Sequence, residues 1–199
     1  MIPPVRQVVL IGPACVGKTT LLPVLAARLG RPAVDLDDVA DAYYEEVGHS
    51  RHELNRVGAA RGDLGAYLWW QEAHPHAVRR VLADYPDAVI ALGAGHTTYA
   101  DPALFEQVRS LLAARDVVLL LPNEDTAESL RILRDRTHAL NDMDWIMDGV
   151  DILEQWVAGP QNAELSSATV YADGLSTGGL ADAVLAALSG KSDRDETRS

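Results

Sequence analysis

Five short apolar runs alternate along the chain with longer segments whose apolar residues recur at helical spacing, as at Leu104, Val108 and Leu111. Strands that are apolar along their whole length, and that alternate with helices, are typical of a parallel sheet covered on both faces. The pattern therefore predicts an α/β fold with strands at 6–11, 33–36, 88–92, 116–121 and 168–172.

The first apolar run leads directly into a glycine-rich loop, GPACVGKT, which matches the G-x-x-x-x-G-K-S/T pattern at every position. Such a loop points backbone N–H groups at phosphate oxygens, and the helix that follows adds the positive end of its dipole. We expect Lys18 to reach the β- and γ-phosphates of ATP and the Thr19 hydroxyl to bind Mg²⁺. The flanking strand and helix favour this interpretation over a chance match. The predicted ATP-binding residues are Gly12, Ala14, Cys15, Val16, Gly17, Lys18, Thr19 and Thr20.

Two carboxylates follow the second apolar run, in AVDLDDV. Asp35 and Asp37 are two positions apart, so in an extended chain both point to the same side, towards a ligand at the carboxyl edge of the sheet. One can hold a metal-bound water and the other can accept a proton from an attacking hydroxyl. Asp38 is expected to begin the next helix, where a capping role is equally consistent with the sequence.

The third run ends in ALGAGH, which indicates backbone brought close to a ligand at Gly93 and Gly95. An ordinary strand-to-helix turn is the alternative. No acidic residue closes this strand, so the usual Walker B aspartate is absent. This absence moves the expected metal site to Thr19 and Asp35.

Composition limits the classes of function. The chain has 199 residues, a net charge of −12 and one cysteine. It has no apolar run of about eighteen residues, and the first strand begins too early to leave room for a signal peptide. We expect one cytoplasmic domain over 1–188 that acts on a small molecule and not on nucleic acid or a membrane, either as a monomer or as a homodimer. The polar segment 189–199 is expected to be disordered.

These motifs, together with the final VYADGLSTGGLADAVLAAL, resemble the shikimate kinase family in order and spacing across most of residues 6–188. The resemblance implies a three-layer P-loop NTPase fold, with a parallel sheet of order 2-3-1-4-5 and a mobile lid at about 131–145. It also implies that Asp35 lies near Mg²⁺ and that Asp37 contacts the acceptor hydroxyl. Gly93, Ala94 and Gly95 match the glycine triad beside the acceptor, with Ala94 in place of the middle glycine.

The chain departs from this family where the shikimate carboxylate is bound. The F-R-x-x-E motif is replaced by GAYLWWQEAHPHAV, GPQNAELSSATV contains no arginine, and HALN stands in place of the lid motif R-P-L-L. Loss of bidentate arginines removes the partner of a planar carboxylate, whereas Trp69 and Trp70 suit an apolar or ring-bearing acceptor. Packing is the alternative role for both tryptophans.

The segment 48–64 is an apparent insertion whose arginines include Arg56, which keeps an acidic acceptor open. In the expected lid, Arg131, Arg134 and Arg136 are candidates to neutralise the transferred phosphoryl group, with one stacking on adenine. A solvated helix face is the alternative for each. The acidic run NDMDWIMDGVD suits either a cationic acceptor or a solvated helix. The histidines at 49, 52, 74 and 76 match no zinc pattern, so we expect solvated or capping roles for them.

The sequence therefore predicts an ATP- and Mg²⁺-dependent small-molecule kinase that phosphorylates a hydroxyl, with an acceptor other than shikimate. A nucleoside or nucleotide kinase and a non-catalytic ATP-binding regulator are the alternatives. The residues expected to act in catalysis are Lys18, Asp37, Arg134 and Arg136, with Arg131 at the nucleotide. Those expected at the acceptor are Asp37, Arg56, Trp69, Gly93, Ala94 and Gly95, and those expected at the metal are Thr19 and Asp35.

Overall fold

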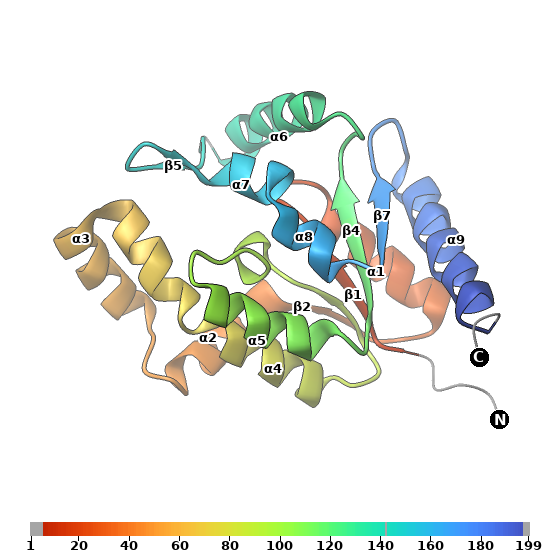
Figure 1. Ribbon diagram of the computed structural model, residues 1–199, viewed down its shortest axis with the longest axis horizontal. Helices are drawn as coiled ribbons and strands as arrows, with labels where there is room; N and C mark the ends of the chain where they lie inside the picture. Colours follow the sequence, from red (N-terminus) through yellow and green to blue (C-terminus); the bar gives the residue numbers. More distant parts are fainter. Residues whose placement is uncertain (1–5, 142, 197–199) are drawn as a thin grey trace.

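The computed structural model describes residues 6–141 and 143–196. A parallel sheet of five strands runs through its centre in the order β2-β3-β1-β4-β7 (Figure 1). Because β7 is the fifth strand of this sheet, the order is the predicted one, and the predicted fold class is confirmed. The strands are β1 (Val8–Ile11), β2 (Ala33–Asp35), β3 (Val89–Ala91), β4 (Asp116–Leu121) and β7 (Ala168–Tyr171).

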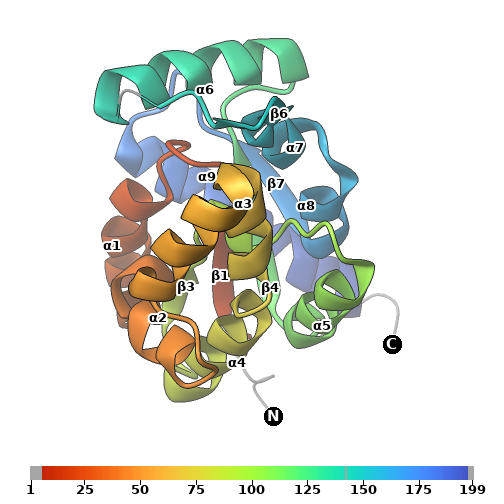
Figure 2. The same cartoon turned by 90° about the vertical axis from the view of Figure 1, so that its left-hand side faces the viewer.

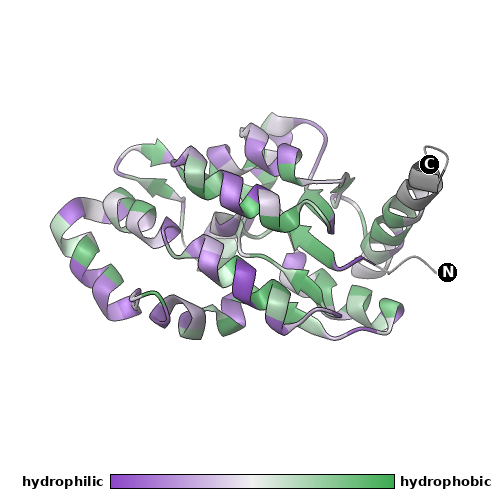
Figure 3. Cartoon of the chain, turned by 60° about the horizontal axis from the view of Figure 1, so that its bottom comes forward, coloured by the Kyte–Doolittle hydropathy of each residue, from purple (hydrophilic) through white to green (hydrophobic). Residues whose placement is uncertain are grey.

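Alternate residues of the central strand face two separate cores. Val9 and Ile11 pack into one core, and Val8 and Leu10 pack into the other, as the period of two in a strand requires. Helices α2 (Leu36–Glu45), α4 (His74–Asp84), α5 (Pro102–Leu112) and α8 (Pro160–Leu165) cover the first core. Helices α1 (Lys18–Leu29), α6 (Thr126–Asn141), α7 (Ile152–Ala158) and α9 (Thr177–Glu196) cover the second. The strands are therefore apolar on both faces, and Figure 3 shows them in green between helices of mixed polarity.

The remaining elements lie at one end of the molecule. Helix α3 (Arg51–Gln71) and the hairpin of β5 (Ile146–Met147) and β6 (Val150–Asp151) project to the same side of the sheet in Figure 1, and Figure 2 is viewed from that side. The 3₁₀ turn η1 (Ala94–His96) follows β3. The helical conformation of α3 is interrupted at Gly62, whose φ of 77° is one that glycine adopts without strain.

Three local expectations differ from the structure. The acidic run after the expected lid contains the β5–β6 hairpin and, over residues 143–151, no helix, because Asp148 and Gly149 both have positive φ (50° and 84°), which suits a two-residue hairpin turn. Helix α2 begins at Leu36, so the second strand is shorter than predicted. Helix α9 continues to Glu196, into the segment 189–199 that was expected to be disordered; extending a formed helix costs little, and 197–199 lie outside the described residues.

No helix within the described part of the chain is long and apolar enough to cross a membrane.

Candidate active site

The glycine-rich loop joins β1 to α1 in a conformation that glycine makes accessible. Gly12 and Gly17 have φ values of 139° and 107°. A Cβ atom on Gly12 would lie 2.4 Å from the carbonyl oxygen of Leu120, so no larger residue fits there. Gly17 is the N-cap of α1 and supplies no side-chain cap. The first N–H groups of α1 therefore stay available for an anion.

Lys18 lies folded back over this loop. Its Nζ donates hydrogen bonds to the carbonyl oxygens of Gly12 at 2.7 Å and Pro13 at 2.8 Å. Burial lowers the pKa of Lys18 to about 8, and the carboxylates of Asp37 and Asp35 oppose this shift. The ammonium group is thus held between the loop that would carry phosphates and the two carboxylates that the sequence analysis singled out.

Thr19 and Asp35 form a direct pair beside the loop. The Thr19 Oγ1 donates to Asp35 Oδ2 at 2.7 Å, while Asp35 Oδ1 accepts from the N–H of Asp37 at 3.2 Å and caps α2. Both Thr19 and Asp35 offer the hard oxygen atoms that Mg²⁺ prefers. The described residues contain no group of three or more side chains suited to enclose a metal ion. This pair fits Mg²⁺, which usually keeps several waters and is held jointly with substrate phosphates.

Asp37 faces the same site as Asp35 for a different reason from the one expected. It lies in the first turn of α2 and not in an extended strand, so the predicted alternation does not apply. Asp35, and not Asp38, caps the helix. The first turn of α2 nevertheless directs the Asp37 carboxylate toward the residues that follow β3. A Cβ atom on Gly93 would lie 2.3 Å from Asp37 Oδ1.

These groups line one cavity of about 450 Å³, called here the inner cavity. Its wall also contains Ala14, Cys15 and the turn of Gly93, Ala94 and Gly95. The structure therefore brings together the loop lysine, the expected metal pair, Asp37 and the expected acceptor turn. Tyr44, His74, His96, Trp145 and Trp156 line it too and were not anticipated.

Two histidines hold the turn of Gly93, Ala94 and Gly95 in place. His96 Nδ1 lies 3.2 Å from the carbonyl oxygen of Gly93 and His74 Nδ1 lies 2.9 Å from that of Gly95, so both nitrogens donate. The Nε2 of His96 then accepts from the Tyr44 hydroxyl at 2.6 Å. Burial lowers the pKa of both histidines and raises that of Tyr44. The interpretation of His74 as solvated or capping is wrong, because its side chain is buried in this cluster.

Two acceptor residues chosen from the sequence lie elsewhere. Trp69 does not line the inner cavity and stacks on His49 with ring centroids 4.1 Å apart, whereas Trp70 lines the cavity and packs on Tyr44. Adjacent residues of a helix point about 100° apart, so one tryptophan of the pair faces inward. Arg56 is exposed and pairs with Glu53 on its own helix.

Another arginine of the insertion reaches the inner cavity instead. Arg51 lines it and donates to Asp41 at 2.9 Å.

The three arginines of the expected lid have different surroundings. Arg136 reaches the phosphate loop, where its Nη1 donates to the carbonyl oxygen of Cys15 at 3.5 Å. Arg134 pairs with Asp151 at 2.5 Å, and Arg131 is exposed and pairs with Glu128 and Asp135. The solvated-face alternative therefore describes Arg131 in this structure, and only Arg136 of the three contacts the loop.

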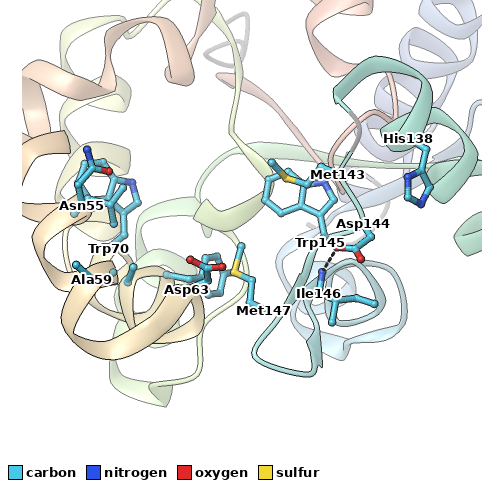
Figure 4. Close-up of a pocket in the computed structure, with 14 residues that line it drawn as sticks. Asn55, Ala59, Asp63, Trp70, His138, Met143, Asp144, Trp145, Ile146 and Met147 are labelled. Carbon is cyan, nitrogen blue, oxygen red and sulfur yellow. Dashed lines mark hydrogen bonds between the residues drawn. The ribbon is translucent and has the colours of Figure 1, made fainter.

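A larger cavity of about 780 Å³, called here the outer cavity, adjoins the inner one. Helix α3 forms one wall and residues 143–147 form the other (Figure 4). Figure 4 shows Asn55, Ala59 and Trp70 on one side, with Met143 and Trp145 opposite them. Leu54, Tyr67, Trp70 and Trp145 line both cavities, so the two spaces are continuous at these residues.

Comparisons with known proteins agree with the fold. A family model described as "AAA domain" matches residues 7–146. Shikimate kinase from Acinetobacter baumannii, solved in complex with shikimate, superposes with a TM-score of 0.65 at 20% identity, covering 94% of this chain and 95% of that one. Shikimate kinase from Aquifex aeolicus gives 0.60 at 15% identity, covering 94% and 98%. A gluconokinase from Sinorhizobium meliloti gives 0.50 at 14% identity, covering 98% and 97%.

No curated protein sequence matches this chain. The structural matches show a shared fold, which is the fold expected from the resemblance to shikimate kinases.

Proposed function

This chain belongs to the family described as "AAA domain", and we propose that it transfers the γ-phosphate of ATP, with Mg²⁺, to a hydroxyl group of a small molecule. The observation that carries the proposal is the inner cavity, where Lys18, Thr19 and Asp37 line one space. A phosphate-binding loop by itself supports only nucleotide binding. A carboxylate positioned in the same cavity, beside the turn at Gly93, supports transfer to an acceptor.

Each residue has a distinct part in the proposed reaction. Lys18 would leave the carbonyl groups of Gly12 and Pro13 and bind the β- and γ-phosphates. Thr19 and Asp35 would hold Mg²⁺ directly or through its waters, and the metal ion when bound supplies charge neutralisation at the phosphate oxygens. Asp37 would orient the acceptor hydroxyl and accept its proton. Arg136 is the lid cation best placed for the transferred group, because it already contacts the loop.

The surroundings of Asp37 also suit its proposed role of orienting the acceptor hydroxyl. The turn at Gly93 packs against its carboxylate, and His96 and Tyr44 hold that turn through buried hydrogen bonds. A group that must align a hydroxyl for in-line transfer gains rate from such positioning. A regulator that only binds ATP has no use for a carboxylate held in this way, so the geometry favours an enzyme over that alternative.

The test is to incubate the protein with MgATP and a panel of ring-bearing and sugar-like alcohols, shikimate and gluconate included. ADP release is followed by a coupled assay, and phosphate esters are identified by mass spectrometry. ADP should appear only with an alcohol that gains a phosphate, and shikimate should be a poor acceptor because the carboxylate-binding arginines are missing. The Lys18→Met variant should keep the fold and lose transfer. Tight ATP binding without any phosphate ester would contradict the proposal and favour a regulator.

A further inference from the structure

We infer that the acceptor is a ring-bearing alcohol without acidic groups, whose apolar body occupies the outer cavity while its hydroxyl lies at Asp37. The inference rests on the proposed function and specifies its substrate class. It depends on three observations: the size and lining of the outer cavity, two buried indole N–H groups without partners, and the charges on the cavity wall.

The outer cavity is too large and too apolar to be explained by a small acid. Its volume of about 780 Å³ exceeds the roughly 450 Å³ of the inner cavity, where the phosphates and reacting hydroxyl would lie. Trp70 and Trp145 stand at the junction of the two spaces, and Met143, Ile146 and Met147 extend the apolar wall outward (Figure 4). Aromatic and thioether side chains suit the faces and edges of a ring system.

Two tryptophans leave polar groups that a ligand can satisfy. The Nε1 atoms of Trp145 and Trp156 are buried and have no hydrogen-bond partner among the described residues. Trp156 is only 2% exposed, and both residues line the inner cavity, with ring centroids 4.7 Å apart. A buried N–H group without a partner is costly. Both atoms are covered by neighbouring side chains, and once these shift on binding, an ether, carbonyl or hydroxyl oxygen of the bound molecule would accept from one or both of them.

The charges on the wall argue against an acidic acceptor. Asp63, Asp144 and His138 line the outer cavity, and no lysine or arginine of the described chain does so. At the inner cavity Arg51 is paired with Asp41, and Lys18 is committed to the phosphate loop. Carboxylates and phosphates of a ligand need arginine or lysine partners. A nucleotide acceptor is therefore disfavoured along with shikimate-like acids.

The test uses two probes that share a naphthalene ring bearing an ethanol side chain. One is 2-(6-methoxynaphthalen-2-yl)ethanol, and the other carries a carboxylate in place of the methoxy group. Binding to the full chain is measured by calorimetry without nucleotide, and phosphate transfer from MgATP is measured separately. Ala59→Trp fills the outer cavity from an exposed helix position that Figure 4 shows on its wall. Ala60→Trp is the matched control, because Ala60 is exposed on the same helix and does not line the cavity.

We expect the methoxy probe to bind the wild type and Ala60→Trp equally, and Ala59→Trp at least about tenfold more weakly. The carboxylate probe should bind the wild type at least about fivefold more weakly than the methoxy probe. No binding of the methoxy probe, no effect of Ala59→Trp, or equal binding of the carboxylate would each overturn the inference. Transfer to acidic alcohols alone would also overturn it while leaving the proposed kinase activity intact. Cavity-specific binding with no transfer to any alcohol would instead refute the proposed function.

Discussion

Asp148 accepts a hydrogen bond from the backbone N–H of Leu64 at 3.0 Å, across 84 residues of sequence. The break in α3 at Gly62 leaves Leu64 at the start of a new helical stretch, whose first N–H groups have no partner within the helix. Asp148 fills the role of an N-cap from the turn between β5 and β6. This contact joins α3, which forms one wall of the outer cavity, to the β5–β6 hairpin, which contributes Ile146 and Met147 to the other.

Asp148→Ala should loosen that connection. We expect faster hydrogen exchange at the Leu64 amide, a loss of about 1 kcal/mol in the free energy of unfolding, and a several-fold increase in KM for the acceptor. Asp87→Ala is the control, because Asp87 is exposed and lies just before the N-terminal end of β3, whereas the site lies at the C-terminal end of that strand. Unchanged exchange at Leu64 would show that the contact does not hold the walls together.

The pH dependence of ATP binding should follow Lys18. Its pKa is lowered to about 8 by burial, so in the free protein the side chain loses its charge as the pH rises through that value. Bound phosphates favour the charged form and raise the pKa. ATP binding should therefore take up a proton above pH 8, and affinity should fall as the pH increases. Calorimetry in two buffers of different ionisation enthalpy measures the uptake.

Two variants test whether Lys18 is the group that titrates. Lys18→Met should abolish the proton uptake, whereas Cys15→Ala, which removes the neighbouring thiol, should retain it. Uptake that persists in Lys18→Met would assign the titration to another group.

Asp37 should differ from its two acidic neighbours in its effect on transfer. Asp37→Asn should leave ATP affinity nearly unchanged and lower kcat by about 10² to 10⁴, the usual contribution of a positioned base. Asp35→Asn should increase the Mg²⁺ concentration required, because Asp35 pairs with Thr19. Asp38→Asn should change little, because Asp38 is exposed and does not cap α2. An inactive Asp38→Asn beside a fully active Asp37→Asn would overturn the assignment.

Gly93→Ala should test the position of Asp37 by steric means alone. The φ of Gly93 is −61°, which alanine adopts freely, yet its Cβ would lie 2.3 Å from Asp37 Oδ1 and 2.8 Å from His96 Nδ1. The carboxylate must move, and we expect kcat to fall by about 10²-fold. Gly190→Ala is the control, since nothing lies within 4 Å of its Cβ position. Steady-state kinetics of both variants, with melting temperatures, provide the comparison.

The sheet and the phosphate loop were predictable because their signals are local. Continuous apolar runs such as Val8–Ile11 require burial on both faces, and the loop pattern depends on residues adjacent in sequence. The β5–β6 hairpin had a signal too, the Asp148-Gly149 pair that favours a tight turn. It was outweighed by the surrounding acidic residues, which suggested a solvated helix.

The acceptor side of the site was less predictable because it depends on contacts between distant segments. Nothing in the sequence near His96 shows that the Tyr44 hydroxyl lies 2.6 Å from His96 Nε2. The choice between Trp69 and Trp70 depends on the rotation of α3, which the Gly62 break and the Asp148 contact help to set. Arg56 has Glu53 three residues before it, a spacing that favours the ion pair observed.

The tryptophans at the site have a further consequence. The chain contains four; Trp70, Trp145 and Trp156 line the inner cavity, and Trp69 lies with its ring centroid 5.9 Å from that of Trp70. Indole emission in the ultraviolet responds to the polarity and the hydrogen bonding around the ring. Every intrinsic fluorophore of this type thus lies at or beside the place where an acceptor would bind. The native chain therefore carries its own optical reporter of site occupancy, without any attached label.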